Sequence, residues 1–315
     1  MTAESFPMIG IALALVSAAV LSAGNLLQSR GVKSSRNRSG SVSVAVPTMS
    51  LVRNRVWLLG AVMLGCAILL QMAALVFAPL MVVQPLGVTS LIFATLIAAF
   101  VLKKRPTKQV LLAIAVCVIG VAIFVTVAAL VSTQHAVDDA QLIAVLVVLG
   151  GVLAVAVIFL IVDRRVGAPP IMWVLLGGVF SAFVATLGKT VILRIQTALR
   201  TRDFDFDGTN VLTIGCIVGI GVAGGLSIYF VQRAHVANRP DVVLAGLTVV
   251  DPAVAVIMGI AVLGEASAAP PWAFVAFAVG GVTAAAGVLM LSRAEREPVD
   301  AYESSPQLVN DENTS

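Results

Sequence analysis

Two charged side chains lie inside long apolar stretches of this 315-residue chain, where they could help to move a charged solute. Asp251 is in the middle of one apolar run, and Lys189 lies near the end of another. An ionised side chain at the centre of a bilayer costs about 2.5–3.5 kcal/mol, so such residues usually face a cavity or a partner. We therefore predict that Asp251 binds a substrate or a coupling ion. Lys189 either contacts the substrate or extends its ammonium group to the membrane surface.

Pro252 follows Asp251 and adds a backbone feature at the same depth. Proline lacks an N–H group, so the carbonyl one turn earlier loses its intrahelical partner. Transporters place coupling ions where helices are interrupted near the bilayer midplane. Pro252 is therefore predicted to belong to the same site as Asp251.

Three side-chain amides complete the set of candidates for contacting the substrate or coupling ion: Asn25, Gln71 and Gln84. Each amide could instead hydrogen-bond to a neighbouring helix. The sequence offers no nucleophile–base pair, no cluster of metal-ligating residues and no phosphate-binding loop. We expect neither enzymatic activity nor a cofactor.

The elements that must position these residues are apolar helices. Hydrophobic residues make up 59% of the chain and charged residues 11%, against about 25% charged in an ordinary soluble domain. Runs long enough to cross a hydrocarbon core of roughly 30 Å predict about nine transmembrane helices in an all-α integral membrane protein. These runs are 7–28, 56–78, 81–102, 110–131, 141–162, 170–192, 211–232, 241–264 and 271–292.

The distribution of basic residues predicts how the helices are oriented. If residues 103–108 are cytoplasmic, nine crossings place sixteen of the twenty Lys and Arg residues in cytoplasmic segments and three in outer segments. Cytoplasmic loops carry the excess of basic residues, so we expect an outer N-terminus and a cytoplasmic C-terminus. We also expect a multi-pass protein of the plasma membrane. The polar stretch 29–55 is predicted to be a flexible connection and the tail 293–315 to be disordered.

The runs also suggest an internal repeat within one transporter domain, 1–315. A shift of 162 residues superimposes apolar runs on apolar runs, so helices 1–4 (7–131) pair with helices 6–9 (170–292) and 141–162 links them. Five helices separate the two starts, so the copies cross the membrane in opposite senses, as in many secondary transporters. The alternative is a loose match between apolar stretches. Pro79 and Pro85 punctuate the first copy and predict a bent helix.

Two motifs resemble the drug/metabolite transporter superfamily, and within it the NIPA-type magnesium transporters. They are FAPLMVVQPLGVTSLIFATLIAAFVLKKR at 77–105 and VVDPAVAVIMGIAVLGEA at 249–266. The first is similar to the family segment FAP-x-x-x-V-x-PLG-x-x-S, and the second to an apolar helix with an early proline that ends in Gly-Glu. One departure concerns the substrate: family members carry an acidic residue three positions before the residue matching Gln71, and this chain has Ile68 there.

These observations leave three functions open. The leading hypothesis is a secondary transporter of a small metabolite or cationic solute that works by alternating access. The second is a NIPA-like divalent-cation transporter, which the resemblance implies. The third is a non-transporting membrane scaffold whose basic loop docks a partner. The expected partners are the lipid bilayer, the transported solute and, in one arrangement, a second copy forming a homodimer; nothing points to nucleic acid.

Overall fold

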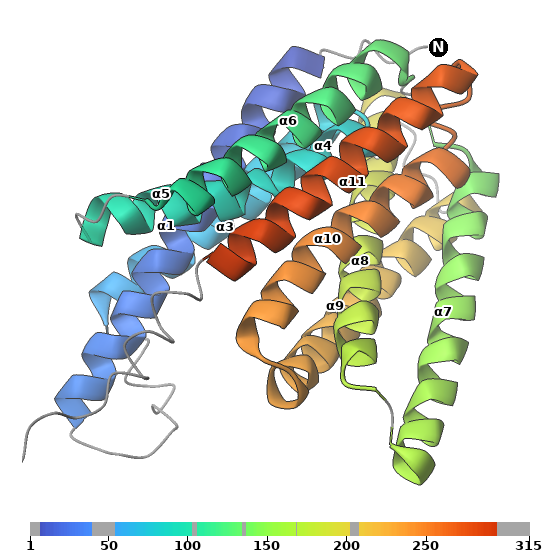
Figure 1. Cartoon of the computed structure of the whole chain (residues 1–315). Coiled ribbons are helices and arrows are strands. Elements are labelled where there is room, and N and C mark those ends of the chain that lie inside the picture. The colour runs from blue at the N-terminus through green and yellow to red at the C-terminus, as the bar shows by residue number, and fades with distance from the viewer. Residues whose placement is uncertain are drawn as a thin grey trace, which may run out of the picture.

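The computed structural model describes residues 7–39, 54–102, 106–133, 137–167, 169–201 and 208–294. Within these ranges every regular element is a helix (Figure 1). The first-half helices are α1 (Pro7–Ser39), α3 (Arg55–Phe77), α4 (Leu80–Gly87), α5 (Thr89–Leu102) and α6 (Lys108–Val131). The others are α7 (Asp139–Val166), α8 (Ile171–Thr201), α9 (Gly208–Ala237), α10 (Pro240–Ala261) and α11 (Pro271–Ala294).

The described helices give nine segments that are long and apolar enough to cross a membrane. One of them, Leu80–Val101, is made of α4 and α5 together. The number of spans predicted from the apolar runs is therefore confirmed for this part of the chain. The sidedness of the bundle stays a prediction.

Some helices extend beyond their predicted apolar runs. The prediction started a flexible connection at residue 29, but α1 continues as a helix to Ser39. Its polar extension packs on the start of α3, where Gly31 lies against Trp57 and the Asn54 side chain donates to the Gly31 carbonyl at 2.9 Å. A helix outside the bilayer does not need apolar residues all round, so hydropathy alone missed it. Residues 40–53 and 295–315 lie outside the described part of the chain.

The helices pair in the same way in the two halves of the sequence. In Figure 1, α1 packs along α3, α8 packs along α9, and α6 lies beside α11. Between the halves, α4 packs against α10, and α7 stands at the edge of the bundle with α9 as its main neighbour. These are the contacts that a repeat relating α1–α6 to α8–α11 would produce, and the inverted repeat itself stays a prediction.

The break between α3 and α4 is the feature that positions the site. Ala78 is extended, Pro79 precedes the first turn of α4, and α4 contains Pro85. α4 ends at Gly87 and α5 begins at Thr89, so the predicted bent helix is confirmed as an interrupted one. Pro85 weakens the helix at this level because it provides no N–H group.

Candidate functional site

Asp251 lies in the middle of α10 and faces α8. The Ser181 hydroxyl on α8 donates a hydrogen bond of 2.6 Å to Asp251 Oδ2. Asp251 Oδ1 is buried and has no hydrogen-bond partner within the described residues. The helices approach closely here because Gly178 leaves room: a Cβ at that position would lie 2.8 Å from Val250 Cγ1. One carboxylate oxygen is therefore held in place while the other is available to a ligand.

Pro252 lies beside Asp251 but faces a different space. It lines an apolar cavity of about 380 Å³ between α4, α6, α10 and α11, together with Pro85 and Thr248. Asp251 does not line this cavity. Pro252 also has no N–H to donate to the Thr248 carbonyl one turn earlier, which leaves a backbone oxygen close to the carboxylate along the helix.

The Lys189 side chain does not extend out of the bundle, so the snorkelling alternative is wrong. Its side chain is buried in the bundle, with 1% of the residue exposed, and it forms an ion pair with Glu265, which is 3% exposed. The ammonium nitrogen also lies 3.5 Å from the Ala78 carbonyl oxygen. Removing one member of such a buried pair costs about 3–5 kcal/mol, because the other charge is left without compensation.

Glu265 also joins the two halves of the bundle. Its Oε1 accepts a hydrogen bond of 2.8 Å from the Leu80 N–H, and its Oε2 accepts one of 2.8 Å from the Met81 N–H. These are unpaired donors at the start of α4, where the helix dipole favours a negative charge. Glu265 therefore caps α4 and neutralises Lys189 at once.

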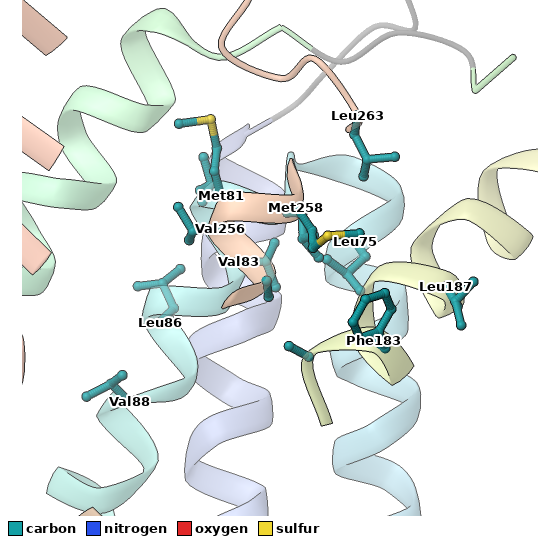
Figure 2. Packing of buried hydrophobic residues seen from close by; sticks show 14 of the residues in the cluster. Leu75, Met81, Val83, Leu86, Val88, Phe183, Leu187, Val256, Met258 and Leu263 are labelled. Carbon is teal, nitrogen blue, oxygen red and sulfur yellow. The ribbon is translucent and has the colours of Figure 1, made fainter. Parts of the chain in front are cut away.

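The backbone after α10 places the Glu265 carboxylate. Gly264 has φ +66°, a left-handed conformation that favours glycine, and the Glu265 N–H turns back to the Gly259 carbonyl at 3.0 Å. The Thr133 N–H donates to the Glu265 carbonyl at 2.9 Å. Figure 2 shows apolar side chains of the core that come from α3, α4, α8, α10 and the turn after α10: Leu75, Met81, Val83, Phe183, Leu187, Val256, Met258 and Leu263.

Within the described residues, Asp251 is hydrogen-bonded to Ser181 and to none of the three predicted amides. Gln84 is buried on α4, with 8% of the residue exposed, and Gln71 is half-buried on α3. Asn25 lines a second cavity, of about 320 Å³, between α1, α5 and α10. The other lining residues are Ser22, Leu26, Ser29, Leu91, Ala94, Thr95, Ala98 and Leu244. Hydroxyl and amide groups make this second cavity more polar than the first.

Sequence reasoning missed Glu265 as a site residue. The motif Gly264-Glu265 was visible, but an acidic residue just after an apolar run is typical of an exposed loop. Its partners Lys189 and Leu80 are 76 and 185 residues away in the chain. Only the packing of α8 and α4 against the end of α10 buries the carboxylate.

The described residues contain no group of three or more His, Cys, Asp or Glu side chains that could hold a metal ion. Asp251 and Glu265 have different partners: Ser181 for the first, and Lys189 with the N–H groups of Leu80 and Met81 for the second. Such an arrangement suits a cation that keeps most of its water, because a hydrated ion needs one or two carboxylates rather than a full protein cage.

Similarity to known proteins covers most of the chain. The model of the protein family described as "Magnesium transporter NIPA" matches residues 6–297. A stretch of 117 residues is 28% identical to a probable magnesium transporter of Candida albicans (strain SC5314), and it spans 37% of this chain and 32% of that relative. No solved structure matches. These similarities favour the divalent-cation alternative over the leading prediction of a small-metabolite carrier.

Proposed function

Since this chain belongs to the NIPA magnesium transporter family, we propose that it carries Mg²⁺ across the membrane and that Asp251 binds the ion on the way. The observation that carries the proposal is the free oxygen of Asp251. A buried carboxylate oxygen without a hydrogen-bond partner, on a span-forming helix, is the type of ligand that a hard cation prefers.

The chemistry of Mg²⁺ fits a single carboxylate. The ion needs near-octahedral coordination at about 2.0–2.1 Å and gives up its water reluctantly, so proteins usually bind it through one or two carboxylates. Asp251 Oδ1 supplies one ligand or accepts a hydrogen bond from an ion-bound water. The Thr248 carbonyl, which Pro252 leaves without a helical partner, is an oxygen one turn away.

We infer that the second cavity is the entrance through which the ion approaches Asp251. Leu244 lines that cavity and lies seven positions before Asp251 on α10, which corresponds to about 10 Å along the helix axis. The hydroxyl and amide groups of Ser22, Asn25 and Thr95 line the same cavity and can replace part of a hydration shell. We infer that the ion moves between this cavity and Asp251 when the halves of the bundle rock against each other.

Ile68 does not weigh against Mg²⁺ in this arrangement. Its side chain is 59% exposed on α3, so position 68 points away from the interior of the single chain. An acidic residue at that position would not contribute a ligand to the Asp251 site. The missing carboxylate therefore leaves the proposed ion route intact.

Flux measurements on the purified wild-type protein in proteoliposomes test the substrate. We expect entry of Mg²⁺, reported by a trapped Mg²⁺-sensitive dye, to exceed that of empty liposomes and to saturate with concentration. Competition by Co²⁺ and by small organic cations defines the selectivity. A folded, reconstituted protein that gives no Mg²⁺ flux would contradict the proposal. In that case, flux of an organic solute would favour the metabolite carrier. The absence of flux for every solute tested would favour the scaffold.

A further inference from the structure

A second carboxylate lies two helical turns from Asp251 along the contact between α8 and α10. On α8, Lys189 is eight positions after Ser181, and on α10, Gly259 is eight positions after Asp251. Eight residues span about 12 Å of helix. Ser181 pairs with Asp251 at one level, and Lys189 pairs with Glu265 at the other. The Ser181–Asp251 pair and the Lys189–Glu265 pair are therefore two polar levels along the same contact between α8 and α10, about two helical turns apart.

The Glu265 carboxylate sits over α10 at the level of Gly259. A Cβ on Gly259 would lie 2.8 Å from Glu265 Oε2, so any side chain at this position would displace the carboxylate. Halfway between the two levels in the sequence, α8 has Ala185 and α10 has Ala255.

The Lys189 ammonium occupies a position lined by oxygen atoms. It contacts Glu265 Oε1 and lies 3.5 Å from the Ala78 carbonyl oxygen. A carboxylate and a backbone carbonyl are the ligands that a hard divalent cation uses. The Glu265 charge is compensated by Lys189 and by two N–H groups at the start of α4. A cation that reaches these oxygens must replace the ammonium.

We propose that Glu265 is a second cation-binding residue and that Lys189 is its built-in counter-ion, which withdraws when the transported ion arrives. This inference rests on the proposed transport of Mg²⁺. The ammonium keeps the buried carboxylate neutralised while no ion is bound, which avoids the cost of an unpaired buried charge. Since Glu265 joins the start of α4 to the end of α10, exchanging Lys189 for Mg²⁺ also changes the link between the two halves.

Replacing Lys189 tests whether an ion can take its place. In Lys189→Met, the carboxylate loses its counter-ion, and we expect Mg²⁺ to raise the Tm of the purified protein by roughly 3 °C or more at saturation. The wild type should respond less because Lys189 competes. The Lys189→Met/Glu265→Gln variant should lose the added response. NaCl at equal ionic strength controls for screening.

A second ion pair at the same end of the bundle provides a matched control. Arg194, on α8, forms an ion pair with Asp139. The Arg194→Met variant leaves the Lys189–Glu265 pair untouched and should show the wild-type response to Mg²⁺. A folded Lys189→Met that gains no more Mg²⁺ stabilisation than this control would overturn the inference.

The double variant keeps the inference testable if Lys189→Met does not fold, because neither charge is then left alone. Its Mg²⁺ flux at limiting concentration should fall about tenfold or more, since one carboxylate of the route is missing. A folded double variant with wild-type Mg²⁺ flux would exclude Glu265 from the ion route and overturn the inference. In that outcome the wild type still carries Mg²⁺, so the proposed function would stand while the second site would not.

Discussion

At the scale of single residues, the site depends on how one serine holds one carboxylate. Ser181 donates to Asp251 Oδ2 at 2.6 Å, and this bond leaves Oδ1 in a defined position. Immobilising a side chain costs about 0.5–1.5 kcal/mol, and a site that is already ordered does not pay this cost on binding. Ser181 is thus a positioning residue for the ion.

Ser181→Ala should therefore raise the KM for Mg²⁺ by about twofold to tenfold and leave kcat close to the wild-type value. The Ser227→Ala variant is the control, because that hydroxyl also donates to α8, but to the Gly177 carbonyl at 3.1 Å and not to the carboxylate. Initial rates of Mg²⁺ uptake as a function of concentration separate the two constants. Equal KM values for both variants would remove Ser181 from the site.

Residue depth was predictable from the sequence, and residue partners were not. Asp251 was identified because it interrupts the middle of an apolar run, where a charged side chain requires a partner or a cavity. Glu265 was missed, and Lys189 was assigned two alternatives, because the pairing joins helices far apart in the chain. The amides Asn25, Gln71 and Gln84 were grouped with Asp251 although the structure places Asn25 at a separate cavity.

At the scale of helices, close contact between α6 and α11 depends on glycine. A Cβ on Gly120 would lie 2.2 Å from the Ala284 backbone nitrogen, and one on Gly287 would lie 2.4 Å from the Cys117 nitrogen. Small residues allow such an approach of two membrane helices, and backbone atoms cannot move aside as a flexible side chain can. The contact thus joins the last helix of each predicted repeat.

Gly120→Ala should destabilise the protein by about 1–3 kcal/mol, the usual cost of overpacking. Gly151→Ala on α7 is the control, since a Cβ there meets nothing within 4 Å and alanine favours the helix. Thermal unfolding of both variants in the same detergent measures the difference. A Gly120→Ala protein as stable as Gly151→Ala would contradict the close packing of α6 and α11.

Helix number was predictable from the sequence because bilayer thickness sets a minimum length of apolar residues. Helix ends were less predictable. α1, α8 and α9 extend beyond their apolar runs, where polar residues continue the helix. The interruption at Val88 followed from Pro85, whereas the cap that Glu265 provides for α4 requires the folded bundle.

At the scale of the whole molecule, the distribution of basic residues predicts sidedness. Sixteen Lys and Arg residues against three predict an outer N-terminus and a cytoplasmic C-terminus. In a variant without Cys66, Cys117 and Cys216, single cysteines at positions 41 and 207 should react with an impermeant maleimide from opposite sides of the membrane. Labelling of both positions from the same side would contradict nine crossings.

The central claim is that a Mg²⁺ ion crosses this bundle by binding the carboxylate of Asp251. Asp251→Asn keeps the size of the side chain and removes its charge, whereas Asp251→Glu keeps the charge and moves the oxygens by one methylene. Asp163→Asn, at the end of α7, controls for the loss of one carboxylate elsewhere.

The most direct measurement is the initial rate of Mg²⁺ entry into proteoliposomes containing equal amounts of folded wild type, Asp251→Asn, Asp251→Glu and Asp163→Asn. We predict saturable entry for the wild type and Asp163→Asn, and a raised KM for Asp251→Glu. The rate for Asp251→Asn should be at least about tenfold lower, because a neutral amide stabilises a divalent ion far less than a carboxylate does. Wild-type Mg²⁺ entry by a stable Asp251→Asn protein would contradict the account.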